Sequence, residues 1–212
     1  MKKKRIFMSV IGVILCAISV AFFKHAAFGM DSFQVFVNGM VELVPISYGT
    51  LYVIINVVLL LFALIFDKHY IGLATLVNLF FLGYIAEFSL YLLEMLLPNP
   101  GIVVRIICLA IGIPMMCLAS ALYYTADMGV STYDAIALIM ANTWKLAKFR
   151  YCRIGVELCA VIIGAALYYF GKDSFSGIGV LIGVGTIITA FCMGPLIEVF
   201  IKTIAEPLSN KN

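Results

Sequence analysis

Three glutamates lie inside apolar runs, where carboxylates are rare. Glu87, Glu157 and Glu198 have almost only apolar neighbours. A charge near the centre of a bilayer costs at least ~2.5 kcal/mol, so such side chains usually face a bundle or cavity and bind protons, ions or solutes. With the polar residues that share or border these runs, they form the candidate substrate or ion ligands: Glu87, Glu198, Glu157, Asn56, Asn78, Thr75, Thr186, Thr189, Asp134 and Gln34.

Two of these glutamates belong to a repeated pattern. It consists of Thr75, Asn78, Gly83 and Glu87, and it recurs as Thr186, Thr189, Gly194 and Glu198. Residues three and four apart share a helix face, so each copy predicts a stripe of small and polar side chains. Such a stripe either packs closely against another helix or contributes to a binding or proton-coupling site, and the sequence leaves both interpretations open.

Composition identifies the class of protein that carries these residues. Of 212 residues, 64% are hydrophobic and 12% are charged, against roughly a quarter charged in soluble domains. Six apolar runs approach or exceed the ~20 residues that span a bilayer; they cover 6–23, 49–66, 71–97, 102–125, 154–170 and 177–204. We therefore predict an all-α integral membrane protein, a single membrane domain over 1–212 with six transmembrane helices. We expect the first run to be a retained helix rather than a cleaved signal peptide.

Two further segments, 31–44 and 131–147, show helical periodicity but are too short to span. We expect them to lie in the membrane interface or to enter the membrane and return. Asp31 and Ser131 suit the N-cap position, and Gln34 and Asp134 stand three residues later, where a capping box would close. Helix capping and ligand contact are both open roles for these four residues.

The chain also contains a duplication that spans its length. Arg5 pairs with Arg105, Gly29 with Gly129 and Asn56 with Glu157. Residues 1–100 and 101–212 are thus predicted to be two copies of one unit, each with three spans and one short amphipathic or re-entrant helix. Three crossings per unit would invert the second copy, an arrangement common in secondary transporters. If the short helices spanned instead, the copies would be parallel.

Basic residues predict the orientation. Loops rich in lysine and arginine usually face the cytoplasm. We therefore expect a multi-pass protein of the bacterial cell membrane with both termini on the cytoplasmic side. The side predicted to be outer carries little beyond Lys24, Arg105 and Lys172. On the inner side, we expect one basic patch to contact anionic lipid headgroups; it comprises Lys145, Lys148, Arg150 and Arg153.

Three stretches carry a family resemblance. They are Met128-Gly129-Val130-Ser131-Thr132-Tyr133-Asp134, Gly183-Val184-Gly185-Thr186 and Gly194-Pro195-Leu196-Ile197-Glu198. Together they resemble the bacterial YczE/YitT-type integral membrane proteins. Two positions depart from the pattern of that family, which commonly has Pro-Trp-Asp where this chain has Thr132-Tyr133-Asp134, and aspartate where this chain has Glu198. The resemblance implies a multi-pass bacterial membrane protein whose family function is poorly defined, and it assigns no catalytic residues.

Transport or export of a small solute, coupled to protons or cations, is the leading functional hypothesis. Inversion would place Glu87 and Glu198 on opposite sides of the midplane, as gates at two mouths. A non-transporting accessory or regulatory protein that acts with a partner complex is the alternative. We expect no enzyme activity, cofactor, metal site or nucleic-acid partner. The expected partners are the lipid bilayer and an unidentified small solute or ion, and the small-residue faces allow a homodimer.

Overall fold

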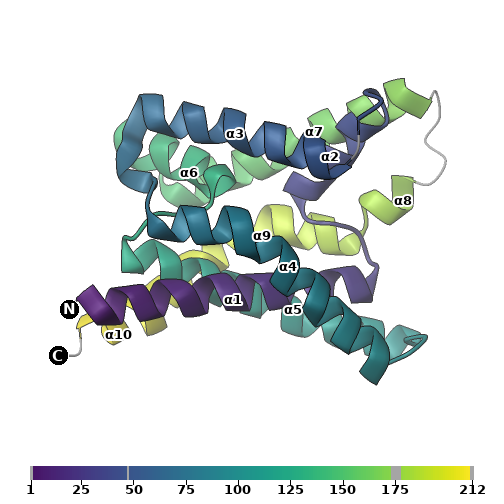
Figure 1. Cartoon of the computed structure of the whole chain (residues 1–212), viewed down its shortest axis with the longest axis horizontal. Helices are drawn as coiled ribbons and strands as arrows, with labels where there is room; N and C mark the ends of the chain where they lie inside the picture. Colours follow the sequence, from purple (N-terminus) through teal and green to yellow (C-terminus); the bar gives the residue numbers. More distant parts are fainter. Residues whose placement is uncertain (1, 47, 173–177, 211–212) are drawn as a thin grey trace.

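A computed structural model describes residues 2–46, 48–172 and 178–210, and these residues form helices and turns without a strand (Figure 1). The long helices are α1 (Lys2–Ala26), α3 (Tyr48–Asp67), α4 (Leu73–Leu96), α5 (Ile102–Ala126), α7 (Phe149–Lys172) and α9 (Val184–Phe200). The last continues through a π-helical turn, η3 (Ile201–Ala205), into α10 (Glu206–Asn210). Within the described residues, six helices are long and apolar enough to span a membrane, which confirms the predicted number. The predicted start of the sixth run, residue 177, lies outside the described residues.

The two short helices begin where the sequence predicts. They are α2 (Ser32–Val41) and α6 (Thr132–Leu138), and α6 continues as a π-helical turn, η2 (Ile139–Thr143). At 10 residues, α2 is only about 15 Å long. Both predicted N-caps are confirmed, because Asp31 accepts a hydrogen bond from the Gln34 N–H and Ser131 accepts one from the Asp134 N–H, each at 3.1 Å.

Both short helices end earlier than expected. The sequence predicted helix to residues 44 and 147, whereas α2 ends at Val41 and the second helix at Thr143. Pro45 disfavours helical backbone at the residue before it. Lys145 adopts a left-handed conformation with φ of 52°, which cannot continue a right-handed helix.

At the centre of the bundle, α1 and α5 pack along each other in opposite directions. Near the start of α1, the Arg5 Nε donates to the Ala126 carbonyl at the end of α5 (2.7 Å). Near the start of α5, the Arg105 Nε donates to the Ala26 carbonyl at the end of α1, also at 2.7 Å. Each cation thus satisfies a carbonyl at the negative end of the neighbouring helix. These reciprocal contacts show that the two helices are antiparallel.

The starts of α4 and α9 are anchored to the turns that precede α6 and α2. The Thr75 hydroxyl donates to the Val130 carbonyl (2.7 Å), and the Thr186 hydroxyl donates to the Met30 carbonyl (2.6 Å). The turns require glycine, because Gly29 and Gly129 have φ of +104° and +96° and an added Cβ would lie 2.4 Å from a backbone nitrogen of the opposing segment. Each half of the chain therefore holds a helix start of the other half.

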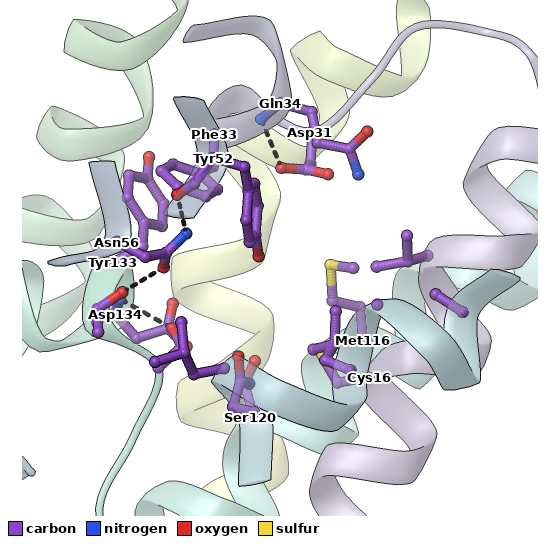
Figure 2. A pocket seen from close by; sticks show the side chains of 18 of the residues that line it. Cys16, Asp31, Phe33, Gln34, Tyr52, Asn56, Met116, Ser120, Tyr133 and Asp134 are labelled. Carbon is purple, nitrogen blue, oxygen red and sulfur yellow. Dashed lines mark hydrogen bonds between the residues drawn. The ribbon is translucent and has the colours of Figure 1, made fainter. Parts of the chain in front are cut away.

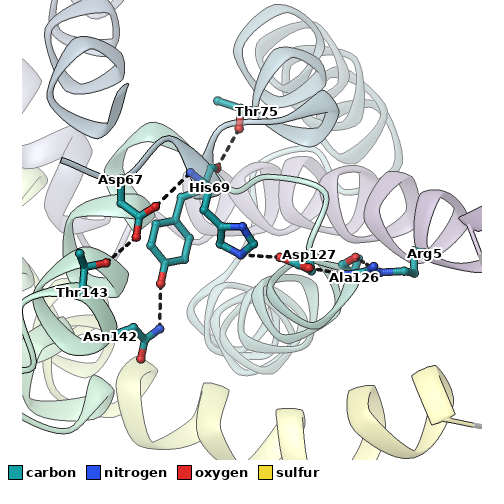
Figure 3. Close-up of polar contacts among 9 residues, drawn as sticks. Arg5, Asp67, His69, Thr75, Ala126, Asp127, Asn142 and Thr143 are labelled. Carbon is teal, nitrogen blue, oxygen red and sulfur yellow. Dashed lines mark hydrogen bonds and ion pairs between the residues drawn. The ribbon is translucent and has the colours of Figure 1, made fainter. Parts of the chain in front are cut away.

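A cluster of polar contacts joins the loops at one end of the molecule (Figure 3). Asp127 forms ion pairs with Arg5 (2.5 Å) and His69 (2.8 Å), and the Thr143 hydroxyl donates to Asp67 (2.5 Å). Buried Met8 and Ala205 pack in one apolar cluster, so the start of α1 and the last helical turns lie at this same end. We call it the terminal end. Residues that the sequence assigns to the inner side are gathered there.

Candidate functional site

A pocket of about 460 Å³ lies within the bundle. Its walls come from α1, α3, α4 and α5 and from the first residues of α2 and α6, with Arg153 of α7 and Met193 of α9. Figure 2 shows Asp31 and Gln34 across the pocket from Cys16 and Met116. Cys16 and Met116 lie near the middle of α1 and α5, so the pocket is at mid-depth of the bundle. This size and position are typical of small-molecule sites between helices.

One wall of the pocket is backed by a buried ionic network. Arg153 pairs with Asp134 through one guanidinium nitrogen and with Glu157 through the other, the latter at 2.6 Å. The Tyr123 hydroxyl donates to the second oxygen of Asp134. All three charged side chains are buried, with exposed fractions of 5% for Arg153, 6% for Asp134 and 3% for Glu157. One buried cation is therefore shared by two carboxylates, which compensates part of the cost of burying all three.

Arg153 corrects one of our predictions. The sequence suggested that it belongs to a lipid-facing basic patch, but its side chain is buried and its charge faces two carboxylates. Glu157 lies one helical turn along α7 on the same face, at the i,i+4 spacing that favours an ion pair. Asp134, offered as a capping-box partner, instead directs its carboxylate to Arg153 and Tyr123.

A second wall combines an amide with aromatic rings. The Thr132 hydroxyl donates to the Asn56 carbonyl oxygen (2.6 Å), and the Asn56 amide donates to the Tyr52 carbonyl (2.9 Å). The Phe33 ring lies 5.6 Å from that of Tyr52 and 4.9 Å from that of Tyr133, between centroids. The Arg153 guanidinium carbon lies over the Tyr133 ring, 5.3 Å from its centroid. These contacts fix the aromatic side chains beside the pocket.

Asp31 brings a carboxylate to the same pocket from the start of α2. Its Oδ1 accepts the capping hydrogen bond from Gln34, and no ion pair of Asp31 occurs among the residues described. Burial raises the pKa of this carboxyl above its usual range, although the Gln34 N–H and the more distant Arg153 charge lower it. Asp31 is therefore a half-buried carboxyl group at the pocket with no ion-pair partner among the described residues.

The structure separates the predicted site residues into two groups. Six line the pocket or belong to the network behind it: Gln34, Asn56, Asn78, Glu87, Asp134 and Glu157. The other four lie elsewhere. Thr75 and Thr186 bind backbone carbonyls of the opposite half, and buried Thr189 donates to the Thr186 carbonyl at 2.9 Å. Glu198, the fourth, contacts the start of α7.

Sequence reasoning missed several side chains that shape the pocket, namely Arg153, Tyr123, Phe33 and Tyr52, and it left capping and ligand contact open for Asp31. Two signals were available. Arg153 and Glu157 have ion-pair spacing on one helix, and Asp31 carries a charge where its counterpart, Ser131, has none. The aromatic residues gave no such signal, because their spacing equally suits packing in an apolar bundle.

Glu87 and Glu198, equivalent in the sequence, occupy different environments. Glu198 accepts a hydrogen bond from the Arg150 N–H in the first turn of α7 (3.1 Å). Gly194 lies against the same turn, where an added Cβ would be 2.9 Å from the Arg150 carbonyl oxygen. Glu87 is exposed at the pocket, and an added Cβ at Gly83 would meet nothing within 4 Å. Gly194 and Glu198 of the α9 stripe are thus packed against α7, whereas Gly83 and Glu87 of the α4 stripe are open.

The open side of the pocket lies away from the terminal end. There α4 diverges from α3 (Figure 1), and it is the most exposed of the six spanning helices among the described residues. Val53, near the start of α3, and Tyr84, on α4, line this side and are 53% and 73% exposed. Lys24, near the end of α1, is also part of the mouth. Toward the terminal end, α9 packs onto the start of α7 through Gly194 and Glu198.

The described residues contain no group of three or more His, Cys, Asp or Glu side chains arranged to hold a metal ion. The chemistry that this arrangement supports is reversible binding. A carboxylate, aromatic rings and amide groups converge on a cavity of solute size, and a buried ion network backs one wall.

Comparison with known proteins identifies the relatives of this chain. Residues 3–202 match the sequence profile of DUF6198, described as a family of unknown function. The chain is 21% identical to YyaS, an uncharacterized protein of Bacillus subtilis (strain 168), over 95% of this chain and 94% of the relative. It is 23% identical to YczE, an uncharacterized membrane protein of the same organism, over 88% and 80%. The predicted resemblance to YczE-type proteins is confirmed. No solved structure matches the chain.

Proposed function

The chain belongs to the DUF6198 family, whose function is unknown, and we propose that it transports a small solute across the bacterial cell membrane. In this proposal the two halves are inverted repeats, both termini are cytoplasmic, and the central pocket is the solute site. The observation that carries the proposal is the difference between the two glutamate stripes on either side of that pocket.

Several contacts support the inverted arrangement. The helices α1 and α5, which open the two halves, run in opposite directions and exchange equivalent arginine contacts. The Ala74 N–H donates to the Met128 carbonyl (2.9 Å), and the Gly185 N–H donates to the Phe28 carbonyl (2.8 Å). A pocket at mid-depth between such halves is the usual place of a transporter site.

The unequal stripes support a two-state cycle. Helix α9 closes the terminal side by packing Gly194 and Glu198 onto the start of α7. Helix α4 leaves the other side open, with Gly83 and Glu87 clear of α3. In the second state, α4 packs onto the start of α3 in the way that α9 packs onto α7 in this structure. In that same state α9 moves away from α7. Each state then exposes the pocket to one side of the membrane.

Protonation gives this cycle a means of coupling. Glu87 stands at the open mouth, and its closure against the start of α3 would bring its carboxylate to helix N–H groups, as Glu198 already does. Protonation of the carboxylates in the pocket, or binding of a solute to them, would then change the relative stability of the two states. Glu157, which is paired with Arg153, would act through that network rather than by direct solute contact.

The experiment is solute-driven proton flux in proteoliposomes. Purified protein is reconstituted with a pH-sensitive dye inside, and amines, carboxylates and sugars are added outside. We expect at least one solute class to drive proton movement, and we expect Glu87→Gln to remove it without lowering the melting temperature. Glu206→Gln, which removes an exposed carboxylate on α10, is the matched control and should keep the flux.

Two results would contradict the proposal. Flux of Glu87→Gln equal to that of the wild type would exclude the gate carboxylate. If no solute class drives flux and another membrane protein co-purifies stoichiometrically, the accessory role becomes the better account.

A further inference from the structure

We infer that the pocket selects solutes that carry a positive charge on an apolar or aromatic body, with Asp31 as the counter-ion. This inference deepens the proposed function and rests on it only for the role of binding in transport. The binding itself is testable on the purified protein.

The charge of Asp31 exceeds what helix capping needs. In the other half, Ser131 caps α6 with the same geometry: both caps accept the N–H three residues on at 3.1 Å. Ser131 does so without a charge, so a hydroxyl suffices for this turn. The contacts of the Asp31 carboxylate among the described residues come from backbone N–H groups, namely those of Gln34, Phe33 and Asp31 itself, and none of them carries a charge. A charge therefore faces the pocket without a structural requirement for it.

The neighbouring charges do not neutralise Asp31. Arg153, the more deeply buried cation of the pocket, is already paired with Asp134 through one terminal nitrogen and with Glu157 through the other. The other lining cation, Lys24, is exposed near the mouth and forms no ion pair within 4.0 Å among the described residues. Glu87 adds a second carboxylate at that mouth. The pocket thus presents more negative than positive charge to an entering solute.

The rings around this carboxylate favour an organic cation over a metal ion. Phe33 and Tyr52 flank the site near Asp31, and Phe80 and Tyr84 line the mouth. Aromatic faces attract ammonium groups through their quadrupole and also accept apolar bodies. A bare Ca²⁺ or Mg²⁺ would need about six or more oxygen ligands, whereas this wall offers mainly rings around one unpaired carboxylate.

A proton and a cationic solute would compete for Asp31. The titratable groups that line the same pocket are Lys24, Glu87, Asp134 and Arg153, with Tyr52, Tyr84, Tyr123, Tyr133 and Cys16. Burial raises the pKa of the Asp31 carboxyl, so protons compete at higher pH than they would at an exposed aspartate. Affinity for a permanently charged cation should therefore fall as the pH is lowered through this pKa.

The test is isothermal titration of the detergent-solubilised full chain with benzyltrimethylammonium, which cannot deprotonate. Phenylmethanesulfonate and benzyl alcohol serve as the anionic and neutral counterparts. We expect saturable binding of the cation alone. Asp31→Asn and Asp31→Ser keep a capping oxygen but lose the charge, so both should weaken binding at least about tenfold at an unchanged melting temperature. Glu206→Gln should bind like the wild type.

Three outcomes would overturn the inference. They are no saturable binding of the cation, wild-type affinity for the cation in both Asp31 variants, or tighter binding of the sulfonate than of the cation. Failure of the proposed function looks different. Cation binding that depends on Asp31, without flux of the same cation in proteoliposomes, would establish the site and contradict transport.

Discussion

At the scale of single residues, the pocket depends on how its charges are partnered. Arg153 is held by two carboxylates that are 6% exposed or less, while Asp31 lines the cavity without an ion pair among the described residues. The first arrangement stabilises a wall, and the second leaves a charge available for a ligand. Charged residues around the same pocket therefore have different roles.

Replacement of Arg153 tests the structural half of this assignment. Arg153→Met would leave Asp134 and Glu157 facing each other without a cation, so we expect a loss of about 3–5 kcal/mol in unfolding free energy. Thermal unfolding in detergent measures it, and Lys148→Ala, which removes an exposed cation, should not change the midpoint. A wild-type midpoint for Arg153→Met would show that the ion network does not stabilise the fold.

Residue identity alone predicted only part of the site. Glu87, Glu157 and Asn56 stood out because polar groups are costly in apolar runs, and the N-caps followed from local spacing. The ion pair between Arg153 and Asp134 was harder to predict, because Asp134 lies on another helix and its side chain was equally suited to a capping box. Such contacts depend on how distant helices pack, which local periodicity does not specify.

At the scale of helices, α4 and α9 show one sequence pattern in two packing states. Gly194 contacts the start of α7, whereas Gly83 has open space around it. The sequence predicted equivalent stripes and left packing and binding open for both. It could not predict the difference, because the same small and polar residues suit either environment.

Leucine at the two glycines distinguishes these environments. Gly83→Leu should fold with an unchanged or higher melting temperature, because the site is open and leucine favours helix. It should nevertheless lose flux, since the side chain would obstruct closure of α4 onto α3. Gly194→Leu should lower the melting temperature, because a Cβ there already lies within 2.9 Å of the Arg150 carbonyl. Wild-type flux in Gly83→Leu would argue against closure at this helix.

At the scale of the whole molecule, the six spans and the two short helices were predictable from hydropathy and helix-start signals. These signals are local, and the membrane makes them strong because backbone groups must pair within a helix. The grouping of loops at the terminal end agrees with the charge pattern. The pocket was not predictable, since it exists only where α4 diverges while α9 stays packed.

The central claim is that the two sides of the pocket open in alternation. Spin-label distances test it most directly, in nanodiscs and with the six native cysteines replaced. One pair, at Val53 and Tyr84, reports the open mouth; another, at exposed Tyr151 and Val199, reports the packed terminal side. We predict that changing pH or adding benzyltrimethylammonium shortens one distance as it lengthens the other. Two distances that stay fixed under every condition, or that change in the same direction, would contradict the account.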